Sequence, residues 1–181
     1  MNDKIASIIV DRLAKKNFAT DQEHLNAAKE VVQEIALLAL SRHGFFGRVA
    51  FQGGTAFRIF YGLDRFSEDL DFALFEPDLQ FSIKHILKPL IEEFESWGLS
   101  LEVTDRTKVD SNVQKAFLKE TSLGAILNLT AALPREQKLK IKIELDINPP
   151  LHARYKPKLY HFPTDYYVTC YEIETMFAGK L

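Results

Sequence analysis

The sequence predicts a single domain of the α/β (α+β) class, in which helices flank a β-sheet. Three observations lead to this prediction. The first 43 residues place apolar side chains at helical spacing, residues 139–147 alternate with a period of two, and short strand and helix patterns alternate between them. With 46% apolar residues among 181, including 14 Phe, the chain can bury a sizeable core, which excludes a disordered protein.

Charge and targeting signals indicate the expected cellular location and partners of the protein. With 23 Lys and Arg against 25 Asp and Glu, the formal net charge is −2, and no global positive field attracts nucleic acid. The first residues lack the apolar stretch of a signal peptide, and no apolar run approaches the ~20 residues that span a bilayer. The single cysteine, Cys170, excludes an internal disulfide framework and is expected to be packed. We therefore expect a cytoplasmic protein without a membrane partner.

Residues 1–48 are predicted to form N-terminal helices. The first helix has one apolar face, made of Ile5, Ile8, Ile9 and Leu13. Thr20 and Glu23 have the capping-box spacing, in which each side chain accepts a hydrogen bond from a free backbone N–H at a helix start. A second apolar stripe follows and ends at Gly44, a typical helix stop.

Residues 49–168 are predicted to form the catalytic α/β core. A short strand, Val49–Phe51, leads into Gly53-Gly54-Thr55, and a helix is expected from Ala56 to Tyr61. Leu70–Leu74 alternates with a period of two and is predicted to be a strand. Phe81–Trp97 has a helical pattern, within which Pro89 predicts a kink or a split.

Further strands are expected in the second half of this core, over Leu99–Thr104, Val113–Leu118, Ala125–Ala132 and Leu139–Ile147. The last of these is the clearest, because five apolar residues share one face. The other face carries only charged residues, namely Lys140, Lys142, Glu144 and Asp146. This strand is therefore expected to be half-buried.

Residues 169–181 are predicted to begin a C-terminal helical region. From Tyr171 to Leu181, apolar residues occupy one helix side, namely Ile173, Met176, Phe177 and Leu181. This stripe is still running at the last residue, so the apolar face is expected to need a partner from outside the chain.

Asp69 and Asp71 are the first candidates for chemistry. They lie two apart in a predicted strand, so both side chains project from the same face, with Cα atoms roughly 6.5–7 Å apart. Adjacent carboxylates repel unless a positive charge compensates them, which a divalent cation does. Mg²⁺ prefers such hard oxygen ligands together with phosphate. The alternative is a solvated strand face that binds nothing.

Gly53-Gly54-Thr55 is the candidate phosphate site. Glycines at a helix start let backbone N–H groups approach an anion without obstruction by a Cβ, and Thr55 adds a hydroxyl. The alternative is a tight turn with Thr55 as the N-cap. The segment has neither the lysine of a Walker loop nor the third glycine of a dinucleotide fingerprint. A phosphate cradle one short helix away from a metal-ligand pair fits the handling of a nucleoside triphosphate.

Arg65 and Ser67, between the two motifs, are candidates for further phosphate contacts. An ion pair of Arg65 with Asp64 or Glu68 is an equally weighted alternative. Thr55, Arg65 and Ser67 would thus join the two glycines in binding the nucleotide.

A third carboxylate on a neighbouring strand is usual in a two-metal phosphoryl-transfer site. The charged face of residues 139–147 offers Glu144, which we favour as metal ligand or base, and Asp146 as the second choice. Lys142, on the same face, would steady phosphates. The alternative is that these are surface charges balanced by their neighbours.

Phe51–Arg58 and Arg65–Phe72 together resemble the AbiEii/AbiGii toxin family of nucleotidyltransferases, within the DNA polymerase β-like nucleotidyltransferase superfamily. Gly-Gly-Thr, Arg-x-Ser and Asp-x-Asp all stand at the family spacing. A looser similarity extends to Lys142–Glu144 and to Glu174–Leu181, where Lys180 matches a functional lysine of the family.

The resemblance implies a nucleotidyltransferase fold with a mixed sheet, binding of Mg²⁺ (or Mn²⁺) and an NTP, and nucleotide transfer to an acceptor. In characterised relatives the acceptor is a tRNA end or a protein. The resemblance also implies a toxin that acts beside a separately encoded antitoxin. Family members normally continue into a helical region with a further catalytic aspartate, so a truncated C-terminal region is expected after Leu181.

A metal-dependent nucleotidyltransferase is therefore the leading hypothesis. The alternatives are a catalytically incomplete module that binds NTP or a partner on the same fold, and a structural protein with an exposed acid pair. Charge is unevenly distributed, since residues 64–105 carry −8 and residues 135–158 carry +4. The basic segment is either a ribbon that tracks an RNA backbone or a solvated face.

Overall fold

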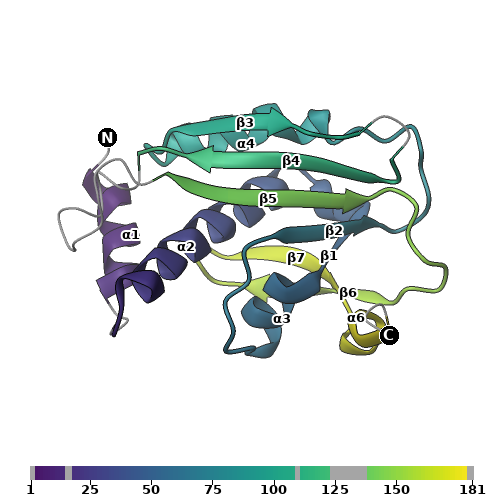
Figure 1. Ribbon diagram of the computed structural model, residues 1–181, viewed down its shortest axis with the longest axis horizontal. Coiled ribbons are helices and arrows are strands. Elements are labelled where there is room, and N and C mark those ends of the chain that lie inside the picture. Colours follow the sequence, from purple (N-terminus) through teal and green to yellow (C-terminus); the bar gives the residue numbers. More distant parts are fainter. Residues whose placement is uncertain (1–2, 15–17, 109–110, 123–137, 179–181) are drawn as a thin grey trace.

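The computed structural model describes residues 3–14, 18–108, 111–122 and 138–178 (Figure 1). The helices are α1 (Asp3–Ala14), α2 (Asp21–Arg42), the 3₁₀ turn η1 (Phe45–Gly47), α3 (Gly53–Tyr61), α4 (Lys84–Ser96) and α6 (Ile173–Ala178). The strands are β1 (Val49–Gln52), β2 (Leu70–Leu74), β3 (Leu101–Asp105), β4 (Val113–Glu120), β5 (Leu139–Asp146), β6 (Tyr155–Tyr160) and β7 (Tyr166–Tyr171).

The described strands form one seven-stranded sheet in the order β3-β4-β5-β2-β1-β7-β6. The β2–β5 and β1–β7 pairs are parallel, whereas the other neighbouring pairs are antiparallel. The predicted α/β class with a mixed sheet and flanking helices is confirmed. The strands that carry the two candidate motifs, β1 and β2, lie near the middle of the sheet, with β5 next to β2.

Helices α2 and α4 pack against each other and lie behind the strands in the view of Figure 1. From Ala27 to Leu40 nearly every residue of α2 is buried, because this helix contacts α4, β5 and β7. Its start confirms the predicted cap. The Thr20 side chain accepts from the Glu23 N–H, and the Glu23 carboxylate accepts from the N–H of Ala19. No helix among the described residues is long and apolar enough to cross a bilayer.

Two predictions in the centre of the chain need correction. Helix α3 begins at Gly53, with Gln52 as its N-cap, rather than at Ala56. Helix α4 starts at Lys84 rather than at Phe81, and it runs through Pro89 as one helix, which excludes the split that was one of the two effects predicted there. Pro89 has no N–H to bond the His85 carbonyl. His85 lies on the exposed side of the helix, where water can bond this carbonyl instead.

The C-terminal part differs most from the prediction. Residues 155–160 and 166–171 form the hairpin β6–β7, which the pattern did not predict. Tyr171 ends β7 instead of starting a helix, and the described part of the helix α6 is Ile173–Ala178. The predicted strand over Ala125–Ala132 lies outside the described residues, as do the last residues of the predicted C-terminal helix.

Candidate active site

Three carboxylates meet where β2 and β5 run side by side. Asp69 directly precedes β2, and the parallel register places Asp71 opposite Glu144 of β5. Each of the three offers a carboxylate oxygen, and these oxygens all lie within 4.8 Å of one another. All three residues are half-buried. Oxygen donors at this spacing suit a hard divalent cation such as Mg²⁺, so the donor set fits the ion that the sequence predicts.

The two glycines bring the start of α3 against this cluster. Gly53 has φ +78°, and a Cβ on it would lie 2.2 Å from Oδ2 of Asp71 and 3.0 Å from the Cβ of Asp71. A Cβ on Gly54 would lie 2.6 Å from the Ser67 Oγ. At Gly53, where the positive φ also disfavours any other residue, only glycine permits this approach. The first backbone N–H groups of α3, which have no partner within the helix, consequently lie beside the carboxylates.

Two lysines balance the acidic cluster. Lys142 Nζ lies 2.6 Å from Oδ2 of Asp69 and 3.4 Å from Oε2 of Glu144. Lys115 Nζ lies 2.5 Å from Oε1 of Glu144, which it faces across the β4–β5 pair. Lys142 was among the predicted residues, but Lys115 was missed. Its only signal is the alternation of β4, since its partner lies 29 positions away in the sequence.

These lysines fix the protonation states around the site. The hydrogen bond to Asp69 raises the pKa of the Lys142 ammonium group, against a smaller opposing effect of burial. Partial burial acts to raise the pKa of Glu144. The hydrogen bond from Lys115 and the charge of Lys142 outweigh it, and the pKa of Glu144 is held below its ordinary value. Glu144 is thus ionised at neutral pH and offers negative charge to a cation.

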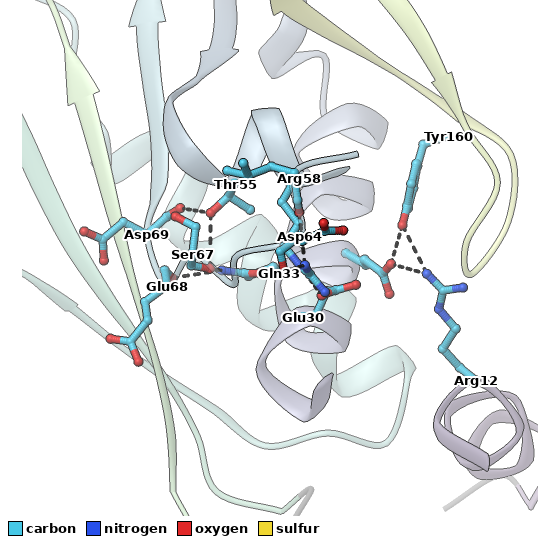
Figure 2. A network of polar contacts seen from close by, with 12 residues as sticks. Arg12, Glu30, Gln33, Thr55, Arg58, Asp64, Ser67, Glu68, Asp69 and Tyr160 are labelled. Atoms are coloured by element: carbon cyan, nitrogen blue, oxygen red, sulfur yellow. Dashed lines mark hydrogen bonds and ion pairs between the residues drawn. The ribbon is translucent and has the colours of Figure 1, made fainter. Parts of the chain in front are cut away.

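Buried side chains from two helices hold the main chain that leads to Asp69 (Figure 2). The Gln33 Nε2 of α2 donates to the carbonyls of Ser67 and Glu68, both at 2.9 Å. The Thr55 Oγ1 of α3 lies 2.5 Å from the Asp69 carbonyl and 3.3 Å from that of Ser67. Gln33 and Thr55 are each 1% exposed. The Thr55 hydroxyl therefore positions Asp69 instead of facing the site, contrary to the expectation of a phosphate contact from this side chain.

The preceding part of the same loop is held by further contacts to α2 and α3. Arg58 pairs with Glu30 at 2.7 Å, and its guanidinium also donates to the carbonyls of Leu63 and Asp64. Lys29 Nζ lies 2.5 Å from Oε1 of Glu68. Helix α2 thus serves as the support for the loop between the two motifs. Gln33 was missed by sequence reasoning, because a buried glutamine has no motif of its own.

A cavity of about 310 Å³ opens at the cluster, lined by Gln52, Gly53, Asp71, Phe72, Val113, Glu144, Asp146 and Met176. Met176 belongs to α6. The ring of its neighbour Phe177 lies 5.1 Å from that of Phe57 on α3, which docks α6 beside the cavity. Asp146 lines the cavity without joining the metal-ligand group, and its Oδ1 accepts from the N–H of Asn148 at 2.9 Å.

The remaining predicted site residues are distributed differently. Ser67 is half-buried against Gly54. Arg65 is exposed and forms neither predicted ion pair, since it makes no hydrogen bond or ion pair with the described part of the chain. Lys180 lies outside the described residues. The structure thus brings together Gly53, Gly54, Asp69, Asp71, Lys142 and Glu144.

A mixed sheet with a glycine-led helix beside strand carboxylates defines the nucleotidyltransferase fold class, and comparison with solved structures confirms it. A candidate nucleotidyltransferase from H. pylori matches with a TM-score of 0.52 and 18% identity, covering 89% of this chain and 58% of that one. The protein JHP933 from Helicobacter pylori matches with a TM-score of 0.54 and 18% identity, covering 89% and 56%. The chain therefore spans just over half the length of these structures.

Sequence comparison identifies the family. Residues 35–181 match the family described as nucleotidyl transferase AbiEii toxin of type IV toxin–antitoxin systems, and the chain belongs to this family. The resemblance that the motifs indicated is thereby confirmed. Among curated proteins, none matches the chain.

Proposed function

We propose that this chain transfers a nucleotidyl group from an NTP to an acceptor hydroxyl, as the toxin component of a type IV toxin–antitoxin system. One observation carries this proposal. Three carboxylates whose oxygens lie within 4.8 Å stand against the N-terminus of α3, with Asp71 filling the space that a side chain at Gly53 would need. Carboxylates that would hold a metal and a helix start that would hold an anion are thus neighbours, which supports binding of an NTP with its metal.

The residues divide into two groups by the part of the substrate that they would hold. Asp69, Asp71 and Glu144 would hold Mg²⁺, or Mn²⁺ in its place, and the bound cation would neutralise charge on the phosphates. The backbone N–H groups at the start of α3, at Gly53, Gly54 and Thr55, would hold the outer phosphates. Further positive charge would come from Arg65, Lys142 and Lys180, and a hydroxyl from Ser67.

The transfer conserves atoms and charge. The acceptor hydroxyl oxygen forms a bond to the α-phosphorus, while the bond from that phosphorus to the bridging oxygen breaks and pyrophosphate leaves with the electron pair. Glu144 is ionised and takes the hydroxyl proton, with Asp146 on the cavity wall as the alternative base. The positive charge of Lys142 stabilises the negative charge that develops on the phosphates as pyrophosphate separates.

Family membership supports a proposal for the acceptor and the partner. An RNA end such as that of tRNA, or a protein, would accept the nucleotide, and a cognate antitoxin would restrain the enzyme. Because the chain spans just over half of the solved relatives, these assignments concern the whole protein and are part of the proposal.

The test replaces Asp69→Asn together with Asp71→Asn and measures transfer of label from an α-labelled NTP to total RNA. We expect transfer to be abolished while the melting temperature is retained. The control is Asp64→Asn with Asp165→Asn, two exposed carboxylates whose loss changes the net charge equally. Transfer by the first variant at the rate of the control would refute the proposed function. Binding of Mg²⁺ and NTP by the native chain without any transfer would support the binding module instead.

A further inference from the structure

The sheet face beside the carboxylate cluster continues, uncovered by any described helix, across β5, β4 and β3. Helix α4 packs on the opposite face, behind β3 and β4 in Figure 1. On the near face the register aligns Thr104, Phe117 and Lys142 across the three strands. Lys142 in turn contacts Asp69. A continuous row therefore leads from the aromatic ring of Phe117 to the candidate metal site.

This face contains a hollow of about 400 Å³, lined by Glu102, Thr104, Arg106, Phe117, Lys119 and Lys140. Phe117 is 38% exposed, although its neighbours Ala116 and Leu118 are fully buried. A large aromatic side chain thus occupies a position where the strand alternation calls for a polar residue. Its ring forms the apolar floor of an otherwise polar hollow.

The hollow carries an excess of positive charge. Lys119 pairs with Glu102 at 2.7 Å, which balances one cation. Arg106 and Lys140 are exposed and make no ion pair with any described residue. One guanidinium and one ammonium group therefore line the hollow with Phe117, and neither has an acidic partner within the described ranges. Cations that flank an exposed aromatic ring match the chemistry of a single nucleic-acid strand, which presents phosphates and flat bases together.

The position of the hollow relative to the glycines decides which substrate fits it. The glycine-led start of α3 lies at the end of β1, and the sheet order places the carboxylates of β2 and β5 between β1 and the hollow on β3–β5. In phosphoryl transfer the attacking and leaving oxygens lie roughly in line, on opposite sides of the phosphorus. With the outer phosphates on the β1 side, the acceptor hydroxyl must approach from the side of the hollow.

We propose that this hollow binds the acceptor as a single strand of RNA, with a base stacked on Phe117 and phosphates held by Arg106, Lys119 and Lys140. The inference rests on the proposed function, since it assigns the second substrate of the same site. The strand runs along the row toward Lys142, which brings its terminal hydroxyl to the carboxylates. A protein acceptor has no equivalent need for an aromatic ring flanked by cations.

The test measures anisotropy of a fluorescein-labelled single-stranded RNA with a free 3′ hydroxyl, using the full chain. Phe117→Leu keeps apolar bulk but removes the stacking face, and we expect about tenfold weaker binding. Phe117→Trp should retain or strengthen it. Arg106→Gln with Lys140→Gln should weaken binding and reduce the slope of log affinity against log salt by about 1.4. The matched control, Lys84→Gln with Lys88→Gln on α4, should leave both nearly unchanged.

Mn²⁺ and NTP binding measured on the same variants separates this inference from the proposed function. Intact Mn²⁺ and NTP binding with weakened RNA binding in the hollow variants supports the assignment. Equal RNA affinity of the Phe117→Leu, Arg106/Lys140 and control variants overturns it and leaves the proposed function standing. Labelling of a protein acceptor by a chain that binds no RNA also overturns it. If the native chain binds neither Mn²⁺ nor NTP, the proposed function itself is rejected.

Discussion

The carboxylate cluster of the candidate site and the buried group around Glu34 both set acidic side chains beside cations, but they are built for opposite purposes. The site group is half-open, with side-chain exposures of 36% for Asp69 and 23% for Glu144. The second group centres on Glu34 of α2, whose side chain is 1% exposed. Arg12 of α1 donates to Glu34 Oε1 at 2.7 Å, and the Tyr160 hydroxyl donates to the same oxygen. Figure 2 shows Arg12 and Tyr160 meeting at this point.

The difference in burial shifts the carboxyl pKa values of the two groups in opposite directions. Burial raises the pKa of Glu34, and the charge of Arg12 with the hydrogen bond from Tyr160 offsets this only in part. Burial acts to lower the pKa of Arg12, but the charge of Glu34 and the hydrogen bond to it help to outweigh burial, so this pKa is raised. Arg12 is one-third exposed and does not remove the desolvation of Glu34. The pKa of Glu144 is lowered instead. Solvent access and two lysines thus keep the site charged, whereas the buried group joins α1, α2 and β6.

Helix α2 connects the two groups, because adjacent residues serve each of them. Gln33 donates to the loop that precedes Asp69, and Glu34 holds α1 and β6. Because Gln33 and Glu34 contact different partners, damage to one group should be separable from damage to the other. Substitutions that displace site oxygens should affect catalysis strongly and stability weakly, and those at Glu34 should do the reverse.

The largest effect is expected for Gly53→Ala. A Cβ at this position collides with Asp71, at 2.2 Å from Oδ2. Gly62→Ala is the matched control, since it has a similar φ of +73° but nothing within 4 Å of the added Cβ. Both variants carry a backbone cost of about 1–2 kcal/mol. We expect transfer to fall about 100-fold or more in Gly53→Ala only.

The comparison is read from nucleotide transfer, Mn²⁺ affinity and urea unfolding measured on both glycine variants. If Gly53→Ala and Gly62→Ala have equal transfer activity and equal stability, then transfer does not depend on the position of Asp71 beside the start of α3.

A smaller effect is expected at Thr55, which acts on the site through Asp69. Thr55→Val keeps the shape and removes the donor to the Asp69 carbonyl, whereas Thr55→Ser keeps the donor. We expect about tenfold weaker Mn²⁺ binding and slower transfer in Thr55→Val, with Thr55→Ser close to the native protein. Mn²⁺ titration together with separate kcat and KM values provides the measurement.

A stability control distinguishes positioning by Thr55 from general weakening of the fold. Ile35→Val removes one buried methyl group from α2 and costs about 0.5–1.5 kcal/mol. If Ile35→Val reduces Mn²⁺ affinity as much as Thr55→Val does, the hydroxyl has no specific role in placing Asp69.

The buried group should make folding stability depend on pH. The folded pKa of Glu34 is raised above its ordinary value near 4.5, so the native state binds more protons than the unfolded chain between those two values. Stability from this group is complete below pH ~4.5 and is lost as the pH rises through the folded pKa, with a slope of at most about 1.4 kcal/mol per unit. Urea unfolding across this range should show the fall, and Glu34→Gln should flatten it. An unchanged slope in that variant would assign the dependence to another group.

Sequence reasoning predicted the site best where local pattern and chemistry coincide. Five alternations identified β5, and the Asp-x-Asp spacing gave two of the three clustered carboxylates. The glycines were expected to leave the backbone N–H groups of the helix start accessible to phosphate. They also make room for the side chains of Asp71 and Ser67. That second reason depends on the β1–β2 pairing, which no spacing along the chain reveals.

The missed elements have physical causes of a similar kind. Strand β6 is mostly exposed and contains Pro157, as an edge strand permits, so its apolar alternation is weak. Strand β7 then continues to Tyr171, where the apolar pattern also suited a helix. Lys115 and Gln33 act across strands and between helices, and their partners become neighbours only in the folded chain.

The smallest effect is expected at Cys170, which extends the comparison to a buried group with no hydrogen-bonded partner in the described residues. Cys170 lies in β7 opposite Phe51 of β1, and its side chain is fully buried. Burial raises the pKa of its thiol to about 12, with the charge of Lys158 offsetting this only in part. We expect negligible reaction with a thiol reagent at pH 8 in the native protein, and full reaction in urea. Rapid labelling without denaturant would mean that β7 separates from β1 in the native protein.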